Sequence, residues 1–367
     1  MSGVHTHPGG VSRPGPSPLD PGVTDPMPGG AAPSRRPLVA AGIPRSGTTW
    51  TMQALECDSS LFRVKEPDHG AEQAPAIWAK RQAGRIPVLA PGDRDDSYHC
   101  LWEWILDGAS ENVRLRIAAQ MLRVMSPPAW GKANRVRAIP TLERIRYQRG
   151  GFSLPMTLAG AIASHPPVRR NPALDDHRLL VKTVHAPLAL EWIASEFEID
   201  VLILLRHPGS ILASWISLDI GEQYVPFAET PAVRQLAEEW GVRLPGPDHL
   251  EQTIWQIGML VVALERAAER HPEWVVRTHE QMCVDPIAQF HRLYDDLGLQ
   301  WNEQTEEFLV DNNRPGKGFR TRRLATDQLD SWKHRLTPDQ IRALQRVMSW
   351  LPLTAWSAED FAVADHS

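Results

Sequence analysis

The residues with the clearest chemical meaning in this sequence form one stretch, Gly42–Trp50, which reads GIPRSGTTW. A short apolar run, Leu38–Ala41, precedes it and predicts a buried strand, and a helix-permissive segment, Thr49–Cys57, follows it. Such a strand, turn and helix can hold an anion, because free backbone N–H groups at the start of the helix point at the bound group. The stretch is therefore predicted to bind a phosphate or sulfate group.

The spacing within this loop separates it from the loops of kinases and other NTPases. Gly42 and Gly47 are five residues apart, as in the pattern G-x-x-x-x-G-K-[ST], but Thr48 stands where that pattern has its lysine. The loop's own cation is Arg45, which lies between the two glycines. The loop can therefore surround an anion with an arginine and hydroxyl groups, but it lacks the lysine that an NTPase places on the β- and γ-phosphates.

Residues 44–50, PRSGTTW, resemble the 5′-phosphosulfate loop of the sulfotransferases that use 3′-phosphoadenosine 5′-phosphosulfate (PAPS), whose usual form is Pro-Lys/Arg-Ser-Gly-Thr-Thr-Trp. The resemblance implies that the loop binds PAPS, with Trp50 stacked near the adenine, and that Arg45 also stabilises the group in transfer. The cofactor-binding residues assigned in this way are Arg45, Ser46, Gly47, Thr48, Thr49 and Trp50.

A second segment strengthens the resemblance. Asp200–Leu205 carries a continuous apolar run, which is typical of a fully buried parallel strand. The run ends at Arg206, and Ser214 follows eight residues later. This spacing resembles the sulfotransferase 3′-phosphate motif, in which an arginine ends a strand and a serine lies two turns into the next helix. The resemblance implies that Arg206 and Ser214 hold the 3′-phosphate, the group that distinguishes PAPS from ATP.

The first candidate for the base that takes the acceptor proton is Glu66. It follows a predicted second strand, Leu61–Lys65, and residues just past the carboxyl end of a parallel strand face the ligand crevice. Several carbohydrate-directed and bacterial sulfotransferases have a similar Lys-Glu-x-x stretch there, and its glutamate is their proposed base. A surface carboxylate that caps the next helix would explain Glu66 equally well.

The second candidate base is His185. Leu179–Pro187 predicts a third strand and resembles the Lys-Thr-His-x-Pro segment of cytosolic sulfotransferases, whose histidine is the catalytic base. The resemblance assigns Lys182 as a supporting cation. Here one extra residue, Val184, separates Thr183 from the histidine, which could rotate the imidazole away from the site. A histidine that is hydrogen-bonded for structural reasons is the alternative.

Two further stretches resemble parts of the family. Asn312–Arg323 is rich in glycine and arginine, and Arg322 and Arg323 are the nearest equivalents of an Arg-Lys-Gly loop that contacts the 3′-phosphate. The following Trp332–Lys333 matches the family's Trp-Lys pair. Val276–Glu280 resembles an Arg-Tyr-Glu-Asp-Leu stretch and is interpreted as structural.

Length and composition favour one large α/β domain. The chain has 367 residues, of which 42% are hydrophobic and 23% charged, as is ordinary for a soluble globular protein. Residues 1–36 contain eight prolines and seven glycines and are predicted to be a disordered leader. The predicted fold of residues 37–360 is a parallel β-sheet flanked by helices, the P-loop-like fold that the sulfotransferase resemblance implies.

Charge, hydropathy and cysteine content exclude other classes of protein. The net charge of −5 gives no basic surplus for nucleic acid, and no apolar run reaches the roughly 18–20 residues of a membrane span. Three widely spaced cysteines indicate neither a disulfide framework nor a zinc site. With no signal-peptide pattern at the N-terminus, they predict a cytoplasmic protein. No metal is expected, and the oligomeric state is left open.

Together these features predict a sulfotransferase that moves the sulfuryl group of PAPS to a hydroxyl of a small-molecule, carbohydrate or natural-product acceptor. The products would be a sulfate ester and 3′-phosphoadenosine 5′-phosphate (PAP). Two alternatives belong to other classes. A small-molecule kinase with a variant P-loop would need Mg-ATP, and the missing lysine argues against it. A non-catalytic PAP-binding protein would bind the nucleotide without turnover.

Overall fold

The computed structural model describes residues 35–125, 154–166, 170–218, 220, 227–314 and 329–362. These residues belong to one compact unit, Ser34–Ser367. The proline-rich leader, predicted to be disordered, lies outside the described residues as far as residue 34, and so do Arg322 and Arg323.

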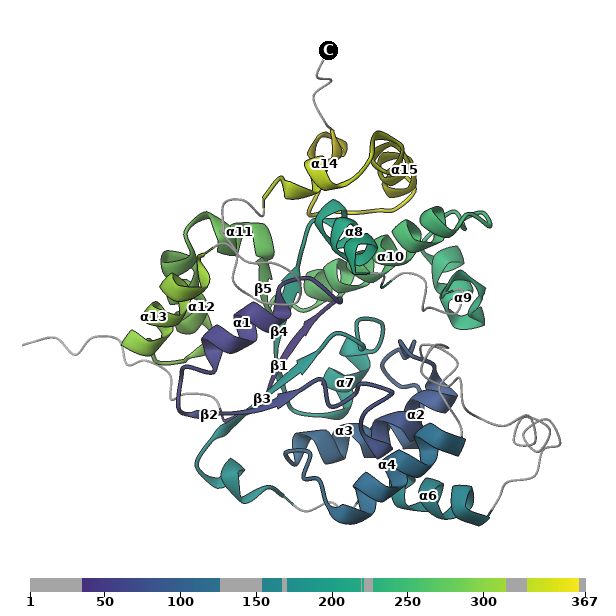
Figure 1. Ribbon diagram of the computed structural model, residues 1–367, viewed down its shortest axis with the longest axis vertical. Coiled ribbons are helices and arrows are strands. Elements are labelled where there is room, and N and C mark those ends of the chain that lie inside the picture. Colours follow the sequence, from purple (N-terminus) through teal and green to yellow (C-terminus); the bar gives the residue numbers. More distant parts are fainter. Residues whose placement is uncertain are drawn as a thin grey trace, which may run out of the picture. The chain divides into compact units, whose positions relative to one another are not determined.

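The centre of the unit is a sheet of five strands, which are β1 (Leu38–Gly42), β2 (Leu61–Lys65), β3 (Arg178–Thr183), β4 (Asp200–Leu205) and β5 (Val275–Thr278). Every neighbouring pair is parallel, in the order β2-β3-β1-β4-β5 (Figure 1). The predicted parallel sheet is therefore confirmed. Because β1 is central, the loop that follows it emerges between the segments that follow β3 and β4.

The strand registers bring the candidate segments to one edge of the sheet. Ala41, near the end of β1, pairs with Thr183 of β3 and with Ile203 of β4. In an open parallel sheet, the ligand crevice lies beyond the carboxyl ends of the strands. The segments that follow β1, β3 and β4 therefore begin nearly level with one another at that edge.

The third strand is shorter than the sequence predicted. β3 ends at Thr183, whereas the apolar run predicted a strand as far as Pro187. The neighbouring strand explains the difference, because the β1–β3 ladder ends at the pair Ala41–Thr183 and the chain of β1 then enters its loop. His185 consequently lies in the connection after β3 and not in the strand.

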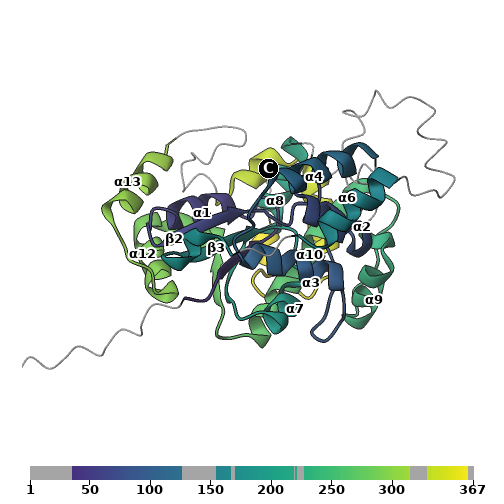
Figure 2. The same cartoon turned by 90° about the horizontal axis from the view of Figure 1, so that it is seen from below.

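Alternate side chains of β1 enter two different cores, as the pleat of a strand requires. Leu38 and Ala40 belong to a core that α1, α12 and α13 cover on one face of the sheet. Val39 and Ala41 belong to a larger core on the other face, which includes α7, α8 and α10 (Figures 1 and 2). The bounds are α1 (Thr48–Leu55), α7 (Leu190–Glu196), α8 (Pro208–Ser217), α10 (His249–Arg270), α12 (Pro286–Leu297) and α13 (Glu303–Asn312).

Four helices pack against one another beside this sheet (Figure 1): α2 (Ala74–Ala83), α3 (Asp96–Leu106), α4 (Val113–Met125) and α6 (Leu154–Ser164). Other helices are α9 (Pro231–Glu239), α11 (His279–Val284), α14 (Ser331–Arg335) and α15 (Pro338–Met348). Short 3-10 helices span Pro172–Asp175, Phe227–Glu229 and Ala358–Phe361. Within the described ranges, no helix combines the length and apolar character that a membrane span requires.

Candidate active site

The loop after β1 leads directly into α1 and leaves the start of this helix open. Gly47 is the N-cap of α1, with a φ of 93°, and no side-chain hydrogen bond caps the helix. The first backbone N–H groups of a helix have no partner within the helix, so they are available to an anion. The N–H of Ser46 differs, because it donates to the carbonyl of Ile43 at 3.0 Å and closes the turn of the loop.

Close contacts require both glycines of the loop. A Cβ added at Gly42 would lie 2.4 Å from Ser46 Oγ and 2.7 Å from Thr48 Cγ2. A Cβ added at Gly47 would lie 2.3 Å from the His279 ring, and the positive φ of Gly47 also disfavours other residues. Gly42 is therefore required by close contacts within the loop, and Gly47 by the close approach of His279 and by its own backbone conformation.

Arg45 joins the two segments that are predicted to bind the two anionic ends of PAPS. Its Nε donates to Ser214 Oγ at 2.9 Å, and its backbone carbonyl accepts from Arg206 Nη1 at 2.9 Å. Trp215 Nε1 donates to the carbonyl of Pro44 at 2.9 Å, so α8 also holds the backbone of the loop. The structure thus brings Arg45, Arg206 and Ser214 together, although they are far apart in the sequence.

The side chain of Arg206 is buried and still has hydrogen-bonding capacity. Only 7% of the residue is exposed. Burial lowers the pKa of Arg206 to about 10, and the nearby carboxylate of Glu280 opposes this change. Arg206 Nε and Ser46 Oγ are buried, and neither has a hydrogen-bond partner within the described part of the chain. A buried cation and an unpartnered hydroxyl beside an open helix start are groups that suit an anionic ligand.

The stretch after β5 also borders the loop, although the sequence led us to interpret it as structural. The ring of His279 packs on Gly47 and lies 5.8 Å from the ring of Trp50, and Glu280 lies near Arg206. Burial, followed by the charge of Arg206, lowers the pKa of His279 well below its ordinary value. The signal that could have found both residues is their position, directly after the carboxyl end of a parallel strand.

On the other side of the loop, Glu66 and Lys182 form an ion pair at the ends of β2 and β3. Lys182 Nζ also donates to Thr49 Oγ1 at 3.1 Å, so the pair contacts the first turn of α1. The side chain of Glu66 is 25% exposed, and that of Lys182 is 3% exposed. The carboxylate is therefore the member of the pair that an acceptor can reach.

The protonation and the backbone of Glu66 are both unusual. Burial would raise the pKa of Glu66, but the charge and hydrogen bond of Lys182 outweigh it, and the pKa lies below its ordinary value. Glu66 also has a φ of 46°, and Arg45 has a φ of 78°. Such conformations are rare outside glycine and persist where the surrounding structure holds them, often at functional sites.

His185 is enclosed, in contrast to Glu66. Only 4% of the residue is exposed, and its Nε2 is buried with no hydrogen-bond partner among the described residues. Its ring packs edge-on against that of His69, with 5.0 Å between the centroids. Burial, followed by the charge of Lys80, lowers the pKa of His185 well below its ordinary value. The imidazole is therefore neutral at pH 7.

The two tryptophans of the predicted motifs have different surroundings. Trp50 is half-buried and packs edge-on against Phe290, with 5.0 Å between the ring centroids. Trp332 is buried and stacked on His207, with 4.9 Å between the centroids. Trp332 therefore supports the N-cap of α8, the helix that carries Ser214.

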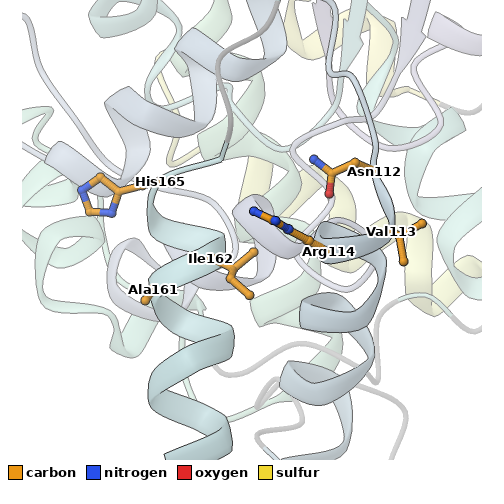
Figure 3. A pocket seen from close by; sticks show the side chains of 6 residues that line it. All are labelled: Asn112, Val113, Arg114, Ala161, Ile162 and His165. Carbon is orange, nitrogen blue, oxygen red and sulfur yellow. The ribbon is translucent and has the colours of Figure 1, made fainter.

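A pocket separate from this edge lies between α4 and α6 (Figure 3). Its volume is about 680 Å³, and it is lined by Asn112, Val113, Arg114, Ala161, Ile162 and His165. None of the described residues that are predicted to bind PAPS or to act as the base lines this pocket. In the same described ranges, no group of three or more His, Cys, Asp or Glu residues is arranged to hold a metal ion.

Comparison with known proteins identifies sulfotransferases. The chain is 25% identical over 195 residues to human carbohydrate sulfotransferase 2, in an alignment that covers 50% of this chain and 35% of that protein. The chain thus spans about a third of the length of this curated relative. No family model matches the chain. The resemblance to sulfotransferases that the motifs predicted is confirmed by this relative.

Two solved structures of sulfotransferases also match. One is a sulfotransferase from Mycobacterium avium, with 18% identity, a TM-score of 0.38 and coverage of 87% of this chain and 76% of that chain. The other is the sulfotransferase domain of an olefin synthase from Synechococcus, with 14% identity, a TM-score of 0.38 and coverage of 84% and 93%. TM-scores this low do not establish a shared fold, so the parallel sheet rests on the strand pairing of this chain alone.

Proposed function

We propose that this protein is a PAPS-dependent sulfotransferase, which transfers the sulfuryl group to an acceptor hydroxyl and releases PAP. The observation that carries the proposal is the hydrogen-bonded group of Arg45, Arg206 and Ser214, in which the loop after β1 meets the segment after β4. PAPS is anionic at its 5′ and 3′ positions, and each of these segments offers a cation for one end. The human relative is named a carbohydrate sulfotransferase, which supports the same class of reaction.

The loop would stabilise the charge that develops on the donor. As the acceptor oxygen bonds to sulfur, the bond from sulfur to the bridging oxygen breaks, and its electron pair leaves with PAP. Arg45, the open N–H groups at the start of α1 and the hydroxyl of Thr48 would stabilise the sulfuryl and bridging oxygens. A preorganised donor of this kind contributes about 3–4 kcal/mol to transition-state stabilisation. Arg206 and Ser214 would bind the 3′-phosphate.

We assign the role of base to Glu66 and not to His185. Glu66 is partly exposed, and Lys182 keeps its carboxylate ionised and linked to Thr49 of the loop. It would accept the proton of the acceptor hydroxyl, a step that is worth about 10²–10⁴-fold in rate. His185 is enclosed and would have to leave its packing against His69 to reach an acceptor.

A thermal-shift titration with PAP, ADP and Mg-ATP tests the nucleotide part of the proposal. A ligand that binds only the folded protein raises Tm as its concentration rises. PAP should stabilise the protein strongly, and ADP much less, because ADP lacks the 3′-phosphate. A preference for Mg-ATP would favour the variant kinase, and no response to any nucleotide would overturn the proposal.

Release of PAP from PAPS tests the transfer itself. The acceptors to try first are sugars, such as a panel of methyl hexosides, because the relative is a carbohydrate sulfotransferase. Phenols form the second panel. Acceptor-dependent release would support the proposal. Tight PAP binding without release in either panel would instead favour the non-catalytic PAP-binding protein.

A further inference from the structure

A second charged pair, Asp68 and Lys80, lies next to the Glu66–Lys182 pair. Both side chains are fully buried, with 0% exposure, and Lys80 Nζ lies 3.4 Å from Asp68 Oδ2. Asp68 follows β2 in the same turn as Glu66, whereas Lys80 is on α2. Two full charges without solvent contact are rare in proteins, so their position beside the proposed base calls for a physical reason.

Lys80 connects three separate segments at this edge of the sheet. Besides Asp68, its ammonium donates to the backbone carbonyl of Arg85 at 3.1 Å and to that of His185 at 3.4 Å. An ammonium has three N–H donors, so these three partners use its full capacity. The turn after β2, the segment after α2 and the connection after β3 are thereby held at one point.

Asp68 in turn holds the turn of Glu66 against β3. Its Oδ2 accepts from Thr183 Oγ1 at 2.7 Å, and Thr183 directly follows Lys182, the partner of Glu66. The N–H of Glu66 donates to the carbonyl of Lys182 at 2.8 Å, and the N–H of His69 donates to the carbonyl of Glu66 at 3.0 Å. The turn with the positive φ at Glu66 is therefore fixed on both sides.

Stability alone is a poor explanation for the Asp68–Lys80 pair. The cost of removing two charges from water roughly offsets their attraction, so buried ion pairs contribute little net stability. The pair is also incompletely bonded, because the buried Asp68 Oδ1 has no hydrogen-bond partner among the described residues. Unpartnered buried polar atoms reduce stability further.

We propose that the Asp68–Lys80 pair is a positioning device that fixes the turn presenting the Glu66 carboxylate to Lys182 and the loop. This inference rests on the proposed function, because it gives Glu66 a part in the reaction. Asp68 and Lys80 act through Glu66 and do not touch the substrate. Without them, the Glu66 turn keeps its ion pair with Lys182 and the hydrogen bond from the N–H of Glu66 to the carbonyl of Lys182. It loses the links through Asp68 to Thr183 and to Lys80 of α2.

The double variant Asp68→Asn/Lys80→Met tests the inference, because it removes both charges and retains the volume of the side chains. Hydrogen exchange of the amides of Glu66 and His69 is the first measurement. Loss of the pair should make these amides exchange about tenfold faster, while the amides of β1 remain unchanged. Unchanged exchange at Glu66 and His69 in the folded double variant would overturn the inference.

The second measurement is PAP release from PAPS, with methyl hexosides as acceptors and with water alone. The double variant should lose about 100-fold in kcat, the loss expected when a reacting group is displaced by about 1 Å, while PAP binding in the thermal-shift titration is retained. Adding the double change to Glu66→Gln should cause no further loss, because both act on the same group. Independent, additive losses would contradict the positioning role.

Two further variants keep the result interpretable. Thr183→Val removes the hydrogen bond that Thr183 Oγ1 donates to Asp68, together with the one that it accepts from the N–H of His185 at 3.2 Å. It should show the same pattern with smaller effects, even if the double variant does not fold. Asp200→Asn breaks the Arg178–Asp200 ion pair at the opposite edge of the sheet and should leave kcat unchanged. Absence of PAP release from the unmodified protein would reject the proposed function, and the exchange experiment would still decide the inference.

Discussion

The two halves of the same sheet edge arrange their charges differently. Beside β4, Arg45 Nε donates to the hydroxyl of Ser214 and Arg206 Nη1 donates to a backbone carbonyl, while the carboxylate of Glu280 lies near Arg206. Hydrogen bonds to neutral acceptors orient a guanidinium without cancelling its charge. Because the two arginines outnumber the carboxylate of Glu280, we expect this half to attract an anion, as the proposed nucleotide with two anionic ends would require.

Beside β2, each described lysine of the site is paired with a carboxylate. Lys182 pairs with Glu66, and Lys80 pairs with Asp68. Pairing cancels the charge but holds a carboxylate in one position and keeps it ionised. The comparison shows that the half beside β4 offers arginines to an anion, whereas the half beside β2 holds carboxylates in fixed positions. The proposed donor binding and proton removal would require these two arrangements.

The largest expected effect is on the paired half. Glu66→Gln should lower kcat for PAP release by about 10²–10⁴-fold, because the amide cannot accept the acceptor proton. PAP should still raise Tm as it does in the unmodified protein. His185→Gln is the matched comparison and should retain most turnover. The opposite result, an active Glu66→Gln and an inactive His185→Gln protein, would move the base to the connection after β3.

The anion-binding half should depend most on Arg45. Arg45→Ala should lower kcat by about 10²–10³-fold, or about 3–4 kcal/mol, because it removes a preorganised cation from the sulfuryl group. The fold should survive, since Arg45 is partly exposed. The rate of PAP release measures the loss of kcat, and the unfolding transition shows whether the fold survives. Arg346→Ala, which changes an exposed arginine of α15, is the control, and an active Arg45→Ala protein would remove Arg45 from the site.

In the half beside β4, the protonation of His207, next to Arg206, should make the stability of the fold sensitive to acid. Burial lowers the pKa of His207 from 6.5 to about 4. The unfolded chain therefore binds the proton more readily, so this stability is fully present above about pH 6.5 and is lost as the pH falls through about 4. The difference corresponds to about 3 kcal/mol.

Unfolding by urea at several pH values measures this contribution. His207→Asn retains an acceptor for the N–H of Gly209 at the start of α8 but cannot titrate. Its stability should change less between pH 6.5 and 4 than that of the unmodified protein. Parallel curves for the two proteins would show that His207 is not responsible for the acid sensitivity.

The smallest expected effect is on PAP binding, and it tests whether Ser214 binds the 3′-phosphate. Ser214→Ala should weaken PAP binding by about 5–10-fold, which corresponds to about 1 kcal/mol for one hydrogen bond, and should leave ADP binding unchanged. Isothermal titration with both nucleotides measures the difference. Ser195→Ala, on α7, is the control. An equal loss for PAP and ADP would show that Ser214 acts on the loop through Arg45 and does not select the 3′-phosphate.

The sequence predicted β4 with its observed bounds because a buried parallel strand carries a continuous apolar run. The bounds of β2 were also predicted correctly, although this strand contains Arg63 and Lys65 and is only partly buried. The predicted end of β3 at Pro187 was wrong, because a strand ends where its neighbour stops pairing. The apolar run beyond Thr183 does not show where β1 stops pairing. The roles of Arg322 and Arg323 stay predictions, because both lie outside the described residues.

The sequence by itself determined the anion loop. Its features are local: two glycines at a set spacing, an arginine between them, and a strand and a helix on either side. Two of the contacts that make Gly42 necessary, to Ser46 and Thr48, also span only a few residues, whereas a third is to the carbonyl of Leu204 in β4. Local sequence was therefore enough to recognise this loop, although distant residues such as His279 and Trp215 also hold it in place.

Only the tertiary structure decided what surrounds that loop. It exposed Glu66, enclosed His185, and brought Lys80 from α2 to Asp68 and to a carbonyl 105 residues away in the sequence. In the sequence, Lys80 looks like any polar residue of a helix. Its burial depends on the packing of β2, β3 and α2 against one another, and such long-range contacts leave no pattern in any single stretch of the chain.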